Sequence, residues 1–298
     1  MKRVNFIKLF PTTGLISFLL LSLSLILVST KGLYYGLDFV GGAELHLKFQ
    51  EFHPLNDVRS FLENTYEEVF VQELTSKESF QLLIKLPTDN LENLTQNVQE
   101  SLNIQFNENV SIEKSDLVGP KAGKDLKTTG IKAIFLALIF IMLYIALRFD
   151  FVHGPAVVLA LLHDILLLFG FFALLHFEFT LQTLAAVLTV MGYSVNNTVI
   201  IFDRLRELIK KNLPLYDAVN QSIYETLSRT MLTTITTLIV SLTMVIFTSG
   251  SLKDFFIIIS LGVLLGTFFS VFLAAPFIYF SKPYLEKLQR FILGDASL

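Results

Sequence analysis

Two apolar runs of the sequence contain side chains that can exchange protons or form hydrogen bonds. His163 and Asp164 lie in one run, and Asn196, Asn197 and Thr198 lie in another. Polar side chains within such runs are costly in a bilayer and usually face a bundle interior or a water-filled path. Histidine relays protons and a positioned carboxyl group exchanges them. The pattern predicts a polar layer inside a helical membrane bundle.

The two runs can bring these groups to a similar depth. Asp164 lies about ten residues from the Gly154 end of its run, or roughly 15 Å along a helix, and Asn197 lies about eight residues, or roughly 12 Å, from its own end. Two interpretations remain open. In one, Asp164 carries a proton and His163 relays it; in the other, Asp164 joins a structural hydrogen-bond network with Asn197 or Thr198.

Charged residues border the polar runs. Asp203 and Arg204 follow the second run and mark its exit from the membrane. Arg229 precedes a later apolar run. Its long side chain can anchor that helix at the membrane interface or point inward as a counter-charge.

A short turn follows the first apolar run of the chain. Asp38 can cap or bond this turn, and the paired glycines Gly41 and Gly42 permit positive φ and close backbone approach. A structural entry turn is the favoured interpretation, with a binding site as the alternative.

The composition indicates a membrane protein. The chain has 298 residues, of which 53% are hydrophobic and 16% charged, and its mean hydropathy is +0.61. Apolar runs near spanning length predict six transmembrane helices at 12–30, 130–147, 155–175, 181–203, 230–249 and 255–280. The first run follows a basic start, as in a signal peptide, but its length favours an uncleaved helix.

Residues 32–127 have a different character and predict a separate α+β domain. Apolar residues alternate along Ala43–Phe49 as in a half-buried strand, and helical spacing follows Pro54. The expected order β-α-β-β-α-β is that of a ferredoxin-like sandwich. We therefore expect four parts: a cytoplasmic N-terminus with the first transmembrane helix (1–31), an extracytoplasmic (periplasmic) domain (32–127), a five-helix transmembrane bundle (128–281) and a cytoplasmic tail (282–298).

Positive charges predict the orientation, because cytoplasmic loops are enriched in Lys and Arg. The 204–229 loop carries five such residues, whereas the turns near 176–179 and 250–254 share one Lys. We expect both termini and the 204–229 loop to be cytoplasmic. A net charge of −3 without a basic face argues against nucleic acid as a partner, and the absence of cysteine excludes disulfides and thiolate chemistry. No metal-ligand or catalytic spacing appears, so we expect no metal site and no enzyme.

Several motifs together resemble the SecF family of protein-export membrane proteins, within the resistance-nodulation-division superfamily. The resemblance covers nearly the whole chain and is carried by Gly36–Gly42, Val118–Pro120, His163–Asp164, Gly192–Asn196, Phe202–Arg204 and Ser228–Thr230. It implies a multi-pass protein of the plasma (cell inner) membrane that promotes proton-motive-force-dependent export of preproteins. The implied partners are SecD in a heterodimer, the SecY–SecE–SecG channel, YidC, preproteins and membrane lipids, with protons as the coupling ion and no other cofactor.

One position departs from the family pattern. Family members have an Asp after the Asn of the fourth-helix motif, and this chain has Asn197 there. An amide does not titrate near neutral pH, so Asn197 cannot carry a proton. Arg229 matches the family's basic residue, which implies an inward orientation. The sequence therefore favours Asp164 as a network member, with coupling carried mainly by SecD. The alternatives are a small-molecule or lipid efflux subunit, and a mainly structural partner of SecD without its own proton path.

Overall fold

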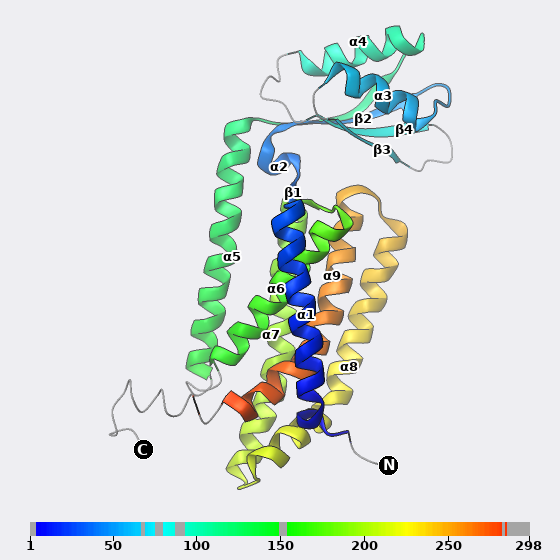
Figure 1. The fold of residues 1–298 in the computed structure, drawn as a ribbon. Coiled ribbons are helices and arrows are strands. Elements are labelled where there is room, and N and C mark those ends of the chain that lie inside the picture. The colour runs from blue at the N-terminus through cyan, green and yellow to red at the C-terminus, as the bar shows by residue number, and fades with distance from the viewer. Residues whose placement is uncertain are drawn as a thin grey trace. The chain divides into compact units, whose positions relative to one another are not determined.

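The computed structural model describes residues 4–66, 69–74, 80–86, 93–148, 154–281 and 284, and the chain divides into two compact units. The helical unit comprises Met1–Tyr34, Ala133–Phe177 and Gln182–Leu298. The mixed unit comprises Tyr35–Lys132 and Glu178–Leu181. Figure 1 labels the nine α-helices and the first four strands of the described residues.

Six helices among the described residues are long and apolar enough to cross a membrane, which confirms the predicted number of spans. Their bounds are α1 Phe6–Lys31, α5 Pro120–Arg148, α6 Gly154–Leu175, α7 Leu181–Lys210, α8 Leu215–Phe247 and α9 Gly250–Phe269, the last continuing through the π-helix η1 Ser270–Ala274. Their length follows from long apolar runs, and Pro11 lies inside α1 without ending it.

Helix α8 begins earlier than hydropathy indicates. The apolar run starts near residue 230, but the helix starts at Leu215, after Pro214. Its first turns bury one stripe, including Ala218, Val219 and Ile223, and leave the other residues partly or fully exposed. Amphipathic spacing therefore extends the helix where mean hydropathy is low.

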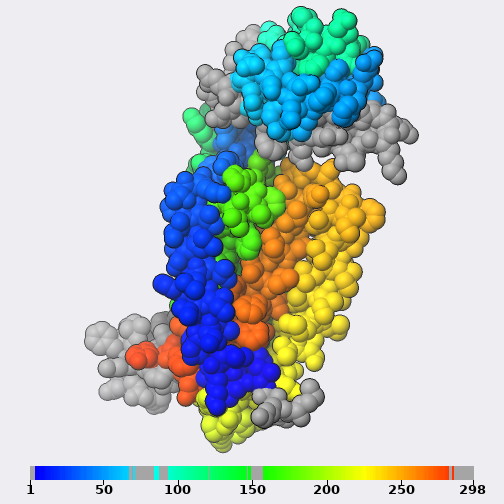
Figure 2. All heavy atoms as spheres, turned by 45° about the vertical axis from the view of Figure 1, so that its right-hand side comes forward, coloured from blue at the N-terminus to red at the C-terminus, as the bar shows by residue number. Residues whose placement is uncertain are grey.

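Helix α1 buries a small polar stripe and exposes large apolar side chains. Thr13, Ser17 and Ser24 are buried, whereas residues such as Phe18 are exposed. Figure 2 shows α1, in blue, at the surface of the helical unit beside α6 in green and α9 in orange. At Gly170 of α6, an added Cβ would lie 2.2 Å from the Ser24 hydroxyl oxygen, so only glycine permits this approach.

The mixed unit contains a four-stranded antiparallel sheet. Its elements follow in the order β2 Gly42–Phe49, α3 Leu55–Thr65, β3 Phe70–Leu74, β4 Phe80–Leu86, α4 Leu94–Phe106 and β5 Ser111–Val118. The strands lie in the order β3-β4-β2-β5, and Leu45 of β2 pairs with Ile84 of β4. The two further short strands, β1 Tyr34–Tyr35 and β6 Glu178–Phe179, pair with each other.

The core of the mixed unit forms between one face of the sheet and the helices. Alternate residues of β2 point inward, and Leu62 of α3 and Val98 of α4 are fully buried against them. The apolar residues that alternate along the strands thus pack against those that recur every 3.6 residues along the helices.

Truncating this core should loosen the mixed unit. We expect Leu62→Ala to lower the free energy of unfolding by about 2–5 kcal/mol, because it leaves a cavity in a fully buried position. Hydrogen exchange of the β2 amides in the full chain measures the effect. Ile104→Ala on α4, where the side chain is 83% exposed, is the control and should change little. Equal effects of the two variants would contradict the assignment of the core.

Candidate functional site

Asp164 occupies the interior of the helical unit. Its side chain on α6 is 2% exposed, and its Oδ2 accepts a hydrogen bond of 2.5 Å from the hydroxyl of Ser194 on α7. Its Oδ1 has no hydrogen-bond partner among the described residues and lies 3.5 Å from Nδ1 of His163. A buried carboxylate with one unpartnered oxygen is costly when ionised, because burial removes its hydration. Asp164 is therefore a buried carboxyl group with one oxygen that is unpartnered among the described residues.

His163 connects three elements. Its Nε2 lies 2.5 Å from the Ser17 hydroxyl of α1, and its ring meets the ring of Phe269 on α9 edge to face, with centroids 4.2 Å apart. Its Nδ1 is buried and, within the described ranges, has no hydrogen bond. Ser17, His163, Asp164 and Ser194 thus form a line of polar groups from α1 to α7.

Asn197 belongs to a second set of polar contacts. Its fully buried amide donates a 3.1 Å hydrogen bond to Thr267 of α9. The Thr267 hydroxyl lies 2.8 Å from that of Thr234 on α8, which also accepts a 2.9 Å bond from Tyr193. The amide oxygen of Asn197 has no partner in the part of the chain that the structure describes. This set joins α7, α8 and α9.

Thr198 is also buried and contacts the π-helix. Its hydroxyl donates to the Ser194 carbonyl oxygen and lies 2.9 Å from the hydroxyl of Ser270 in η1. The wider turn of a π-helix shifts the residues that follow it around the axis, and such turns are common at functional positions. Ser270, the first residue of η1, contacts the polar face of α7.

Asp164 and Asn197 do not bond to each other. Both are buried, but Asp164 pairs with Ser194, three residues before Asn197, and Asn197 pairs with Thr267. We did not predict the role of Ser194. Its position at i−3 from Asn197, hence on the same helix face, is the signal that could have found it.

Two predicted residues do not face the interior. Asn196 is exposed, because consecutive residues of a helix point about 100° apart and Asn197 takes the inward position. Arg229 is exposed on α8, where its neighbour Thr230 is the buried residue. In this chain by itself, Arg229 thus lies at the surface of the helical unit, and its inward orientation stays a prediction. Arg229 also lies within α8 rather than at its start.

Asp203 and Arg204 form ion pairs near the end of α7. Asp203 pairs with Arg148 of α5 at 2.9 Å, and Arg204 pairs with Glu207 of α7 and Glu225 of α8. These groups are partly exposed, so each pair contributes little stability by itself. They tie three helices together beyond the apolar part of α7.

The Gly-Gly turn has a structural role in the mixed unit. Asp38 lies in the short helix α2 Leu37–Val40, and its carboxylate accepts a 2.8 Å hydrogen bond from the Leu181 backbone N–H, at the first residue of α7. Gly41 and Gly42 have φ of 92° and 136°. A Cβ at Gly123 would lie 3.1 Å from the Gly41 nitrogen, so the close approach of the two segments favours glycine at position 123.

Comparisons with known proteins agree with each other. The chain matches two protein-family models: "Protein export membrane protein SecD/SecF, C-terminal" over residues 98–283, and "SecD/SecF GG Motif" over residues 26–51. It is 37% identical to a protein translocase subunit SecF of Rickettsia prowazekii, with 87% of this chain and 85% of that protein covered. It is 34% identical to the subunit SecF of Desulfurispirillum indicum, with 96% of each covered.

Solved structures show the same likeness. The crystal structure of SecDF from Thermus thermophilus, titled a translocon-associated membrane protein, matches with a TM-score of 0.83 and 32% identity over 94% of this chain. A SecDF in a super-membrane-facing form matches with a TM-score of 0.71 and 30% identity over 98% of this chain. The chain spans 39% and 40% of those two longer chains.

Proposed function

Because the chain belongs to the SecD/SecF family of protein-export membrane proteins, we propose that it is a multi-pass plasma-membrane subunit that promotes proton-motive-force-dependent export of preproteins. Named relatives of this kind are translocase subunits, that is, transport components. Protons serve as the coupling ion. The SecY–SecE–SecG channel and YidC are proposed neighbours.

One observation carries the coupling proposal: the unpartnered Oδ1 of Asp164 beside Nδ1 of His163. Protonation of Asp164 would remove the cost of a buried charge and let the carboxyl group donate toward His163. Ser194 can bond the carboxyl group in both states. In our proposal Asp164 takes the place of the family's usual carrier, and Asn197 holds α7 to α9.

A structural role for Asp164 is the competing candidate. The amide at position 197 favours it, because the chain then lacks the family's carboxylate there. In that case this subunit holds SecD in place and SecD alone couples protons to export. Replacement of Asp164 separates the two, as argued below.

The mixed unit is proposed to be the extracytoplasmic part that holds preprotein. Its β-α-β-β-α-β order and its sheet order β3-β4-β2-β5 support a ferredoxin-like sandwich.

We expect a cysteine at exposed Ser60 of the mixed unit to react with an impermeant thiol reagent in intact cells. A cysteine at exposed Lys211, after α7, should react only once the membrane is opened. The chain has no native cysteine to interfere. Labelling at 211 alone in intact cells would reverse the proposed orientation.

SecD is the proposed main partner, and one face of α7 suits it. Along this face α7 exposes small or polar residues at helical spacing: Gln182, Ala185, Thr189, Gly192 and Asn196. Lipid-facing stretches elsewhere expose large apolar residues, as α1 does at Leu15 and Phe18. Small residues let membrane helices approach closely and polar ones bond across them. We therefore place the SecD half against this face.

Blocking this face should release SecD. A Cβ added at Gly192 would meet no neighbouring atom within 4 Å, so Gly192→Leu should fold normally but prevent close approach of a partner helix. When the tagged chain is purified, we expect the amount of SecD recovered with it to fall at least about tenfold. A tenfold loss of affinity corresponds to about 1.4 kcal/mol of binding free energy. Val240→Leu on α8, where the side chain is 63% exposed, is the control. Undiminished recovery of SecD with Gly192→Leu would contradict the placement.

A further inference from the structure

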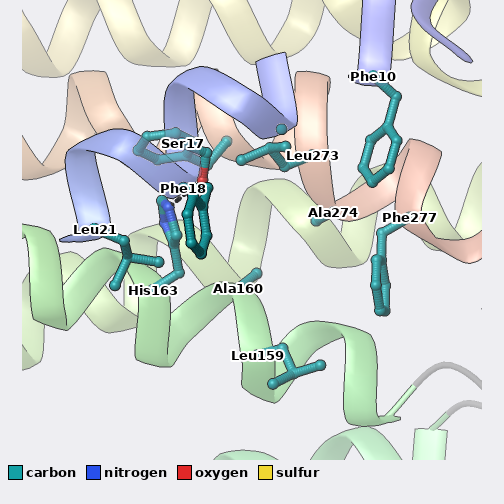
Figure 3. A pocket seen from close by; sticks show the side chains of 12 residues that line it. Phe10, Ser17, Phe18, Leu21, Leu159, Ala160, His163, Leu273, Ala274 and Phe277 are labelled. Carbon is teal, nitrogen blue, oxygen red and sulfur yellow. Dashed lines mark hydrogen bonds between the residues drawn. The ribbon is translucent and has the colours of Figure 1, made fainter. Parts of the chain in front are cut away.

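The middle of α1 is attached to the helical unit by hydrogen bonds. The Thr13 hydroxyl lies 3.3 Å from the Phe272 carbonyl oxygen of η1 and shares its hydrogen with the Leu9 and Phe10 carbonyl oxygens of its own helix. The Ser17 hydroxyl bonds His163 at 2.5 Å. Figure 3 shows the Ser17–His163 contact as a dashed line across the helices. Single hydrogen bonds contribute modestly and depend on the state of both partners. This attachment can therefore change when either partner moves.

A pocket beside these two bonds gives α1 room to move. It has a volume of about 260 Å³ and is lined by apolar residues of α1, α6, α9 and η1, with Ser17 and His163 as its polar side chains. A Cβ at Gly14 would meet no atom within 4 Å. Helix interfaces are normally close-packed, so little packing resists a shift of α1 here.

The His163 ring lies between two competing partners. Nε2 faces Ser17 at 2.5 Å, and Nδ1 faces Oδ1 of Asp164 at 3.5 Å. A cationic ring and a carboxylate favour a contact of about 2.8 Å. Because the ring is rigid, closing the Nδ1 contact moves Nε2 and lengthens or misaligns the bond to Ser17.

No other charged group contacts this ring in the described part of the helical unit. From α1 it meets Ser17, from α9 it meets Phe269, and on its own helix it meets Asp164. A change of charge at His163 or Asp164 therefore acts on Ser17 without a competing ion pair.

We propose that Ser17 and His163 form a proton-sensitive latch on α1: the latch is closed when His163 is neutral and opens when a proton joins the His163–Asp164 pair. Helix α1 ends at Lys31, and the chain continues through Gly32 into β1 and the mixed unit. When the latch opens, a movement of α1 can therefore be passed along the chain to the mixed unit. The inference rests on the proposed proton exchange at Asp164, and Ser17 is a positioning residue in it.

Spin-label distances test the latch. Cysteines at Thr30, near the end of α1, and at Phe247, the last residue of α8, are both exposed and carry the labels in a chain without native cysteine. The labelled chain is reconstituted with SecD in lipid vesicles. Distances are measured by pulsed electron paramagnetic resonance at about pH 8 and pH 5, the interval in which histidines change charge. We expect a second distance population that grows several-fold at low pH.

Four variants assign the effect. Ser17→Ala should show the second population at both pH values, and His163→Gln should show no change with pH, because Gln can bond Ser17 but gains no charge. Gly14→Leu should fill the pocket and suppress the second population. Ser22→Ala is the matched control, since Ser22 bonds only the Phe18 carbonyl oxygen of its own helix and should behave as the parent chain.

Two results would overturn the latch: distances that do not change with pH, or a pH-dependent change that persists in His163→Gln. If one of these results is found and Asp164→Asn still abolishes proton-driven export, the proposed function stands and the latch fails. A pH-dependent distance that follows the expected variants, together with export that ignores Asp164→Asn, supports the latch and removes the coupling proposal.

Discussion

Asp164→Asn should abolish the proton-driven part of preprotein export and leave the complex with SecD assembled. The amide has nearly the shape of the carboxyl group, and its oxygen can accept the hydrogen bond that Ser194 donates. Its NH2 group can face Nδ1 of His163 in place of Oδ1. The structural contacts therefore survive, whereas the exchangeable proton is lost.

Export into membrane vesicles with and without an imposed proton gradient measures this effect. We expect the variant to export at the level that the parent complex shows without a gradient. Asp217→Asn, at an exposed carboxylate in the first turn of α8, is the matched control and should retain the stimulation. Full stimulation of Asp164→Asn at normal levels of the complex would assign Asp164 a structural role and leave coupling to SecD.

Asn197→Asp should make the stability of the chain depend strongly on pH. The Asn197 side chain is fully buried, and Arg229, the basic residue that the family resemblance pairs with this position, is exposed on α8. An ionised carboxylate at position 197 would lack a counter-charge and cost on the order of several kcal/mol. Because only the folded state penalises the charge, stability should fall as the pH rises and recover as the carboxyl group is protonated at low pH.

Thermal unfolding of the purified chain at about pH 5 and pH 8 measures this dependence. Asn196→Asp makes the same chemical change one residue away on the exposed face, and it should show little dependence on pH. If Asn197→Asp is as stable as the parent at pH 8, then a cation reaches position 197. The inward orientation of Arg229 would then be restored, and the variant should strengthen proton coupling.

The number of spans and the presence of a polar layer were predictable, because hydropathy reports both directly. The sequence did not predict how each helix is rotated about its axis, and hence which of its residues face the interior. Asn196 and Asn197 are adjacent and chemically alike, and packing against α9 determines that Asn197 alone turns inward to bond Thr267. Arg229 was placed inward by resemblance to a family position, whereas the structure buries Thr230 beside it.

Contacts distant in sequence were also missed. Ser17 and His163 are separated by 146 positions, and a single serine in an apolar helix carries no signal of its partner. The pairing of Asp164 with Ser194 rather than Asn197 depends on an offset of less than one helical turn, which a depth estimate does not resolve. The role of Asp38 at the first residue of α7 likewise needed coordinates.

Proton flux through the reconstituted complex tests the central claim most directly. Vesicles contain this chain with an unaltered SecD, and the internal pH is followed after a membrane potential is applied. We expect Asp164→Asn to remove the flux that the parent complex supports, whereas Ser22→Ala leaves it unchanged. Flux through the Asp164→Asn complex equal to that of the parent would contradict the assignment of a proton carrier to this chain.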